Sequence, residues 1–196
     1  PLAFHRFSSL LPLAPGEPER LTWHSAWDGV NCWTRDGERV LFTSYRDSLE
    51  TQLYSVGAGG GLPVRVVKDR AMNATLSPDG RWLAYVRGRT PWWRKHYHGS
   101  ASRDIWIRSS DGGPSVQVVG TPLDEDRPMW SADGRSLYFM KEDDAGVANI
   151  WSVALEIPGE GDDRLPGAAR EPVQVTRHGH DGVQAARISG DGTTIV

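Results

Sequence analysis

The sequence has little that would support a disulfide framework, a membrane span or a general nucleic-acid interface. Cys32 is the single cysteine among 196 residues, so no disulfide can form within the chain. No apolar run approaches the roughly 18 residues that a transmembrane helix needs. The net charge of -3 lacks the basic excess that is typical of nucleic-acid binding. We therefore expect neither a membrane partner nor a nucleic-acid partner.

Turn-forming residues and tryptophan are abundant instead, with 22 Gly, 13 Pro and 9 Trp. This composition is typical of many short strands joined by turns, rather than of long helices. The stretch 74–107 shows the pattern most clearly. Pro78-Asp79-Gly80 forms a turn signal, and the run from Trp82 to Arg87 has the two-residue alternation of a strand. The sequence therefore predicts an all-β fold.

The same pattern recurs along the chain. Short strands run into Asp-Gly at four places, which are Asp36-Gly37, Asp79-Gly80, Asp133-Gly134 and Asp191-Gly192. An aliphatic–aromatic pair follows three of them, at Leu53-Tyr54, Ile105-Trp106 and Ile150-Trp151, and a Val-rich segment closes each unit. Repeats of about 40–50 residues with four strands each are the signature of β-propeller blades. Such a sheet cannot bury both apolar faces alone, so we expect the blades to pack face to face.

The spacing predicts one partial propeller domain over residues 1–196, an incomplete ring of four-stranded antiparallel blades. It holds three whole blades and two half-blades: a half-blade at 1–22, blades at about 23–67, 68–119 and 120–176, and a half-blade at 177–196. The first half-blade should supply only the third and fourth strands of a blade, and the last only the first and second. The tryptophans of the strands should fill the core. The insertion 157–170, rich in Gly, Pro and charge, should be a solvated loop.

A second insertion, 88–103, joins the second and third strands of the second blade and is basic and aromatic. It opens on the same face as the connections between blades. Together they supply the candidate contacts for a substrate or partner: Trp92, Trp93, Arg94, Lys95, Tyr97, His98, Arg103, Asp126 and Arg127. Basic and aromatic side chains could recognise a carboxylate or a peptide. Alternatively, the loop packs its Trp pair on a neighbouring blade and leaves its charges in water.

No pattern in the sequence predicts catalytic residues, a metal site or a cofactor. Ser, His and Asp are present without a G-x-S-x-G motif, a phosphate loop or a dinucleotide fingerprint. The acidic run Asp124–Asp126 falls in a predicted loop, which does not define a paired-carboxylate hydrolase. His178, His180 and Asp181 have a metal-like spacing, but hydrogen bonding that fixes the connection into the next strand explains them more simply.

The segment SPDGRWLAYVR followed by RDIWI resembles the propeller repeats of TolB, of prolyl-oligopeptidase and dipeptidyl-peptidase propellers, and of tricorn protease. The inserted segment PWWRKHYHGSASRDIWI looks most like the tricorn type. The resemblance implies a large cytoplasmic serine peptidase that degrades short peptides and assembles into oligomers. Such proteins carry a six-bladed propeller, a seven-bladed propeller, a PDZ-like domain and a catalytic core.

Under this resemblance, the chain is a non-catalytic part of the six-bladed propeller and acts as a substrate gate or scaffold. Its partners would be short peptides, the remaining blades, the catalytic domains and further copies of the protein. The family's catalytic residues lie downstream, so no residue here inherits that role. The family's arginine pair for the substrate C-terminus has no counterpart in TWHSAWDGVNCW. The alternatives are a periplasmic TolB-like interaction propeller and, less simply, a small metal-assisted enzyme that uses the two histidines.

Overall fold

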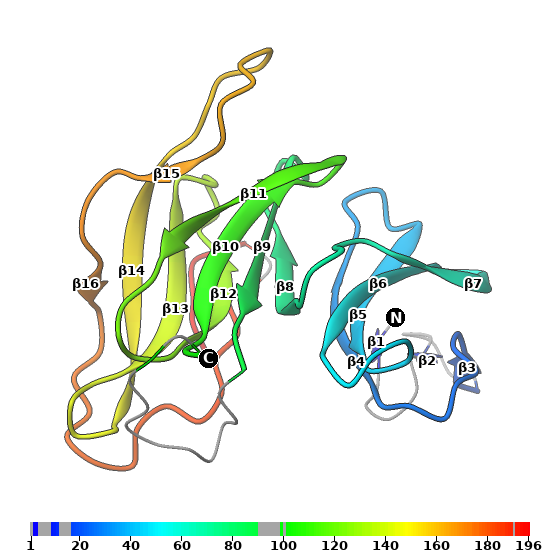
Figure 1. The fold of residues 1–196 in the computed structure, drawn as a ribbon, viewed down its shortest axis with the longest axis horizontal. Helices are drawn as coiled ribbons and strands as arrows, with labels where there is room; N and C mark the ends of the chain where they lie inside the picture. The colour runs from blue at the N-terminus through cyan, green and yellow to red at the C-terminus, as the bar shows by residue number, and fades with distance from the viewer. Residues whose placement is uncertain (1, 4–8, 12–16, 90–98, 100, 190) are drawn as a thin grey trace. The chain divides into compact units, whose positions relative to one another are not determined.

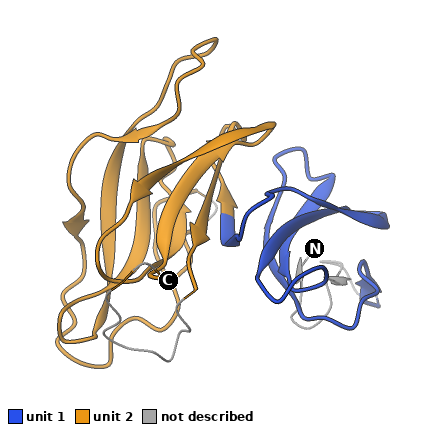
Figure 2. Ribbon diagram, viewed as in Figure 1, with its two compact units in different colours: residues 1–74 blue, residues 75–196 orange. Residues whose placement is uncertain are grey.

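The computed structural model describes residues 2–3, 9–11, 17–89, 99, 101–189 and 191–196. Within these ranges it contains sixteen strands and no helix, so no described helix could cross a membrane. The chain divides into two compact units, residues 1–74 and 75–196, and each is described by itself (Figure 2). The single-domain reading of the sequence stays a prediction, whereas the all-β class is confirmed.

The first unit contains a small three-stranded sheet and a complete four-stranded blade. The small sheet has the order β1-β2-β3, and the blade has the order β4-β5-β6-β7 with antiparallel neighbours. The strands are β1 (Leu2–Ala3), β2 (Ser9–Leu11), β3 (Glu19–Arg20), β4 (Asp28–Trp33), β5 (Arg39–Ser44), β6 (Gln52–Gly57) and β7 (Gly60–Arg65). The sequence predicted only two strands before residue 22. The additional strand, β1, has two residues, too few to show a period.

Two further blades follow, with sheet orders β11-β10-β9-β8 and β12-β13-β14-β15, and β16 also pairs with β14. Their strands are β8 (Met72–Leu76), β9 (Trp82–Arg87), β10 (Asp104–Ser109), β11 (Gly112–Val119), β12 (Glu125–Trp130), β13 (Ser136–Glu142), β14 (Ala148–Glu156), β15 (Gly167–Ala168) and β16 (Val173–Gln174). An antiparallel bridge between Ile188 and Ile195 follows them. The predicted four-stranded blades are confirmed.

Each Asp-Gly turn is held by the same hydrogen-bond network. In the second blade, the Ser77 hydroxyl donates to Asp79 over 2.5 Å and accepts the backbone N–H of Trp82 over 2.9 Å. The Asp79 carboxylate also accepts the N–H of Arg81 over 3.0 Å. Thr34, Ser131 and Ser189 make the same bonds in the other turns. The glycine of each turn has a positive φ of 68–76°, a conformation that glycine adopts without a steric penalty.

Replacing Ser77 with alanine should lower the free energy of unfolding by about 1–2 kcal/mol, because the buried N–H of Trp82 loses its acceptor. Urea unfolding measures the difference. Ser110→Ala is the matched control, since the hydrogen bond recorded at Ser110 comes from its backbone N–H. It should change stability by less than about 0.5 kcal/mol. Equal losses in the two variants would show that the turn network does not stabilise the blade.

The second and third blades pack their apolar faces against each other within the second unit, where Figure 1 shows β9–β11 and β12–β14 as adjacent layers. The buried cluster joins Trp82, Ala84, Ile105, Ile107, Val118 and Val119 to Trp130, Leu137, Phe139, Val153 and Leu155. A separate cluster around Met129, Met140 and Ile150 meets Val183, Ala186, Ile188 and Ile195 from the last segment. The third blade is thus covered on both faces, as packed propeller blades require.

The aromatic residue of each aliphatic–aromatic pair lies beneath a cation from its own blade. The Arg87 guanidinium lies 4.8 Å from the ring centroid of Trp106, and the Lys141 ammonium lies 4.4 Å from that of Trp151. Arg46 lies 5.1 Å from the ring of Tyr54. In the second and third blades, these cation–π contacts cover the half-buried rings of Trp106 and Trp151, whereas Tyr54 is itself buried.

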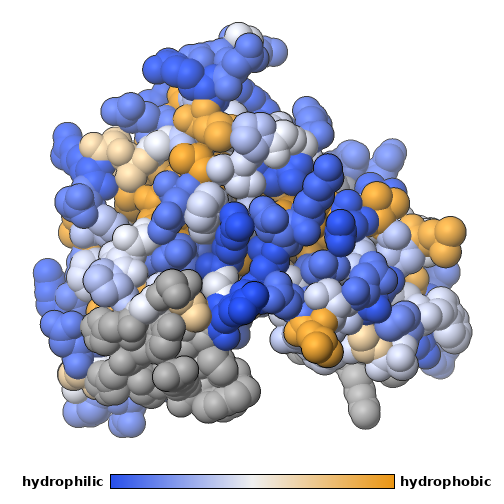
Figure 3. Space-filling view, viewed as in Figure 1, coloured by the Kyte–Doolittle hydropathy of each residue, from blue (hydrophilic) through white to orange (hydrophobic). Residues whose placement is uncertain are grey.

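The insertion 157–170 is not a wholly solvated loop, which corrects the prediction from its composition. Ile157 and Leu165 pack against the cluster between the blades, and β15 pairs with the end of β14. Arg81 of the second blade donates to the carbonyl oxygens of Pro158 and Gly159. The Gly, Pro and charged residues of the insertion gave no indication that Ile157 and Leu165 pack against the blades. We call residues 157–166 the strap, and Figures 1 and 3 show it as a mostly hydrophilic projection.

Candidate functional site

The candidate site lies where the inserted segment 88–103 returns to the second blade. The backbone N–H of Arg89 donates to the carbonyl of Ala101 over 2.9 Å, which closes the base of the insertion. A Cβ atom at Gly88 would lie 2.4 Å from the Ser102 carbonyl oxygen and 2.5 Å from Cα of Arg103. Only glycine therefore permits this close approach. The two contacts fix Arg103 directly before β10.

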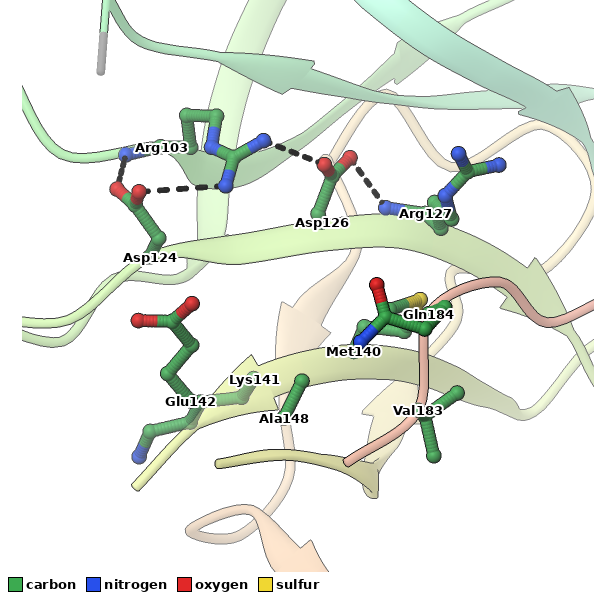
Figure 4. A pocket seen from close by; sticks show the side chains of 10 residues that line it. All are labelled: Arg103, Asp124, Asp126, Arg127, Met140, Lys141, Glu142, Ala148, Val183 and Gln184. Atoms are coloured by element: carbon green, nitrogen blue, oxygen red, sulfur yellow. Dashed lines mark hydrogen bonds and ion pairs between the residues drawn. The ribbon is translucent and has the colours of Figure 1, made fainter. Parts of the chain in front are cut away.

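Arg103 binds the connection that leads into the third blade (Figure 4). Its guanidinium donates to Asp126 over 2.6 Å and to Asp124 over 3.2 Å, and its backbone N–H donates to Asp124 over 2.8 Å. The three side chains are only 11%, 18% and 6% exposed, in the order Arg103, Asp126, Asp124. The carbonyl of Arg103 also accepts the N–H of Glu125 over 2.8 Å. We call Arg103, Asp124 and Asp126 the Arg103 network.

A fully buried carboxyl group lies beside this network. Glu125 is 0% exposed and accepts the hydroxyl of Thr121 over 2.5 Å. Burial raises the pKa of Glu125 to about 8. Burial, and then the charge of Asp124, raise the pKa of Asp104 to about 6. Burial also raises the pKa of Asp124, although the contacts with Arg103 oppose the shift. The site therefore collects acidic groups that hold protons more tightly than carboxyls in water.

The raised pKa of Glu125 predicts that stability depends on pH. The stabilisation that comes from burying the protonated Glu125 carboxyl is fully present below the ordinary glutamate pKa of 4.5. It is lost as the pH rises through about 8. Glu125→Gln removes the titration, so its free energy of unfolding should fall less than that of the unmodified protein between pH 5 and pH 8. Urea unfolding across this range measures how the free energy of unfolding changes with pH in the unmodified protein and in Glu125→Gln. Glu160→Gln, an exposed substitution on the strap, is the control. Identical slopes in all three proteins would contradict the assignment.

Arg127 has an unusual backbone conformation next to the network. Its φ is 51°, in the left-handed region that non-glycine residues rarely adopt. The cause is a register shift between Asp126, which pairs with Met140, and Met129, which pairs with Tyr138. The N–H of Arg127 donates to the Asp126 carboxylate over 2.7 Å. Strain of this kind often marks functional positions, and here it places Arg127 at a pocket.

The pocket has a volume of about 180 Å³ and lies between the connection, β13 and the last segment (Figure 4). It combines the Arg103 network with Arg127, Lys141, Glu142 and Gln184, above an apolar wall that includes Met140 and Val183. Its lining thus carries three basic and three acidic side chains. This balance allows hydrogen bonds to a peptide backbone and to either peptide terminus, without selecting for net charge.

The structure brings three of the predicted contact residues together, because Arg103, Asp126 and Arg127 line this one pocket. The other six lie outside the described residues: Trp92, Trp93, Arg94, Lys95, Tyr97 and His98. The sequence placed 124–127 in a loop, which is wrong for 125–127, since β12 begins at Glu125. It missed Thr121, Lys141 and Glu142. The pairing of Glu125 with Lys141 across the strands could have indicated Lys141, but recognising this pair requires the register of β12 against β13.

The region of His178 and His180 forms no metal centre in the described ranges, where no group of three or more ligating side chains occurs. His180 Nδ1 lies 3.4 Å from Asp181 Oδ2, and both side chains point into solvent. The segment around His178, which follows the third blade, is fixed by Asn149. This residue is fully buried, and the sequence did not indicate its role. Its carboxamide accepts the N–H of His178 over 2.8 Å and donates to the His178 carbonyl over 3.2 Å. The backbone of His178 carries these bonds.

A family model described as the tricorn protease N-terminal beta propeller domain matches residues 10–196. The chain belongs to this family. A relative named "Uncharacterized peptidase YuxL" from Bacillus subtilis (strain 168) is 31% identical over 109 residues, which are 52% of this chain and 15% of that protein. A second relative, "Uncharacterized protein Atu1656" from Agrobacterium fabrum, is 26% identical over 68% of this chain and 42% of its own length. The chain therefore spans less than half of the length of either relative.

Solved structures of other proteins share the propeller fold of this family member. TolB from Acinetobacter baumannii superposes with a TM-score of 0.64 at 14% identity, covering 91% of this chain and 39% of that one. Tricorn protease superposes with a TM-score of 0.50 at 16% identity, covering 75% of this chain and 15% of that one. At these identities the likeness shows the fold alone. The chain is thus a propeller of a kind found both in peptidases and in TolB-like proteins.

Proposed function

We propose that this chain is a non-catalytic propeller segment of a tricorn-like cytoplasmic serine peptidase that degrades short peptides. In this role it admits peptides toward catalytic domains elsewhere in the parent protein and serves as their scaffold. The observation that carries the proposal is the family match over residues 10–196. The parent protein would act as an oligomer, with its catalytic residues outside this segment.

The rigidity of the Arg103 network favours the proposed role as a gate. A gate that discriminates by size needs a rim that does not deform, and Arg103 ties the inserted segment to the connection between two blades through largely buried ion pairs. The blades beneath it are held by an apolar cluster that includes Phe139 and Leu137. The pocket beside the network offers charges of both signs, which suits peptides of varied sequence.

The experiment compares hydrolysis of internally quenched peptides of about 5 and about 25 residues by the full-length protein. We expect a strong preference for the shorter peptide, and Arg103→Ala should reduce that preference while a small serine-directed fluorophosphonate still labels the protein at the unmodified rate. Arg164→Ala, which alters an exposed ion pair, is the control. A protein that cleaves neither peptide, or an unchanged length preference in Arg103→Ala, would contradict the proposal.

A TolB-like docking role is the second candidate, and exposed apolar side chains in the first unit favour it. Trp23 is 78% exposed, Leu49 is 98% exposed, and the rings of Trp27 and Tyr45 lie 6.4 Å apart. Such side chains are typical of protein interfaces. A photoreactive residue at position 49 of the full-length protein would distinguish the roles in cells. A defined protein adduct favours docking, and crosslinks confined to the parent protein favour the peptidase scaffold.

A further inference from the structure

Two arginine side chains from distant parts of the sequence lie close together beside the pocket shown in Figure 4. Arg127 lines this pocket, and Arg187 belongs to the last segment, whose Val183 and Gln184 form part of the pocket wall. Two hydrogen bonds with the backbone of Val196, of 2.8 and 2.9 Å, fix the backbone of Arg187. Partial burial, and then the charge of Arg127, lower the pKa of Arg187. The two guanidinium groups therefore repel each other.

No carboxylate of this chain neutralises the two cations. All 25 Asp and Glu residues of the sequence lie within the described ranges, and none of them forms an ion pair with Arg127 or Arg187. Asp126 pairs with Arg103 and accepts only the backbone N–H of Arg127. The guanidinium of Arg187 donates to the carbonyl of Ala186 over 3.4 Å, which supplies no charge. An anion that bridges the two arginines must therefore come from a ligand.

The backbone at Arg127 indicates that its side chain has a role beyond the blade itself. Asn73 lies at the same place before the turn of the second blade as Arg127 does in the third, and it has nearly the same φ, 49° against 51°. Asparagine adopts this left-handed region more readily than most residues, whereas arginine has no such preference. The third blade therefore keeps a less suitable residue at this position, as strained functional positions often do.

The direction of the Arg127 side chain limits where an anion can bind. Figure 4 shows its guanidinium pointing away from the Asp126 carboxylate and away from the apolar wall that contains Met140 and Val183. Arg187 is exposed, so a ligand can reach it from solvent. A ligand that fills the pocket and also contacts Arg127 must therefore carry its negative charge on a group that projects beyond the pocket.

We propose that Arg127 and Arg187 together bind the side-chain carboxylate of a glutamate or aspartate in a peptide whose backbone enters the pocket. A guanidinium binds a carboxylate through paired charge-assisted hydrogen bonds, and a carboxylate shared by both arginines removes their repulsion. A side chain projects from the peptide backbone as this geometry requires, whereas a C-terminal carboxylate is part of the backbone. The balanced pocket leaves the overall charge of the peptide unselected, so the arginine pair recognises a single position. The inference rests on the proposed contact of this pocket with peptides, but not on peptidase activity.

Calorimetric titration of the full-length protein with the capped peptide acetyl-Ala-Ala-Glu-Ala-Ala-amide tests the site. We expect this peptide to bind about fivefold or more tightly than its glutamine analogue, which has the same length but no charge. Arg127→Asn removes the cation and suits the backbone conformation, so it should fold and should bind the two peptides equally. Arg187→Gln should have the same effect. Arg135→Gln, which removes an exposed arginine in the turn of the third blade, should leave the preference unchanged.

The glutamine peptide with a free C-terminal carboxylate separates a side-chain ligand from a peptide terminus. It should bind no more tightly than its amide, and tighter binding that is lost in Arg127→Asn would overturn the assignment to a side chain. Equal binding of the glutamate and glutamine peptides by the unmodified protein, or a glutamate preference that survives both arginine substitutions, would overturn the site. A glutamate preference in a protein that hydrolyses neither quenched peptide would uphold the site and contradict the peptidase role alone.

Discussion

Replacing Phe139 with alanine should lower the free energy of unfolding by about 4 kcal/mol, the largest effect that we expect from a single substitution in this protein. Phe139 lies in the middle of β13 and is 0% exposed. Its ring belongs to the cluster that joins the second and third blades, together with Trp82, Ile105 and Val153. The substitution removes contacts from both blades and leaves a cavity between them, because the strands on either side are fixed by their ladders.

Urea unfolding followed by tryptophan fluorescence measures this loss. Leu62→Ala is the matched control, since Leu62 lies on the outer strand β7 and is 91% exposed. It should change stability by less than about 0.5 kcal/mol. If the Phe139 and Leu62 variants lose similar amounts, the second and third blades are not held together by the packing of their apolar faces.

Replacing Arg103 with alanine should lower the free energy of unfolding by about 3 kcal/mol. The guanidinium is the shared partner of Asp124 and Asp126, whose side chains are 6% and 18% exposed. Without it, two carboxylates close to each other lose their counter-charge in a largely dry environment.

Arg164→Ala provides the comparison for Arg103→Ala, since it removes an Arg–Asp pair of 2.7 Å whose arginine side chain is 80% exposed. Exposed pairs contribute little to stability, so thermal and urea unfolding should separate the two variants clearly. Arg103→Lys keeps the charge but cannot reach both carboxylates with a planar fork, and it should lose an intermediate amount. If Arg103→Ala and Arg164→Ala lose similar amounts of the free energy of unfolding, the Arg103 network does not hold the connection into the third blade.

The repeated blades could be predicted because their signals are local. Asp79-Gly80 forms a turn that only a few residue types permit, and the alternation from Trp82 to Arg87 has the period of a strand. The same two signals repeat at each blade, so the period indicated the architecture. The hydroxyl two residues before each Asp was equally local, at Thr34, Ser77, Ser131 and Ser189, but its role emerges only from the turn geometry.

The site could be predicted only in outline, because its contacts join residues that are distant in sequence. Arg103 meets Asp124 and Asp126 across 21 and 23 positions. No period or motif links such residues until the return of the chain from β11 to β12 is known. The strap shows the same limit. Ile157 and Leu165 are single apolar residues within a polar segment, and only the packing reveals them as anchors.

A cryo-electron microscopy structure of the full-length protein is the most direct test of the proposal that this chain forms the peptide-admitting propeller of a peptidase. We predict that the Ile188–Ile195 bridge continues into a further four-stranded blade. We also predict that the Arg103 network lines the mouth of the propeller channel, on the path to the catalytic domains. A structure in which the network is buried against another domain, or in which the channel does not lead to a peptidase active site, would contradict the proposal.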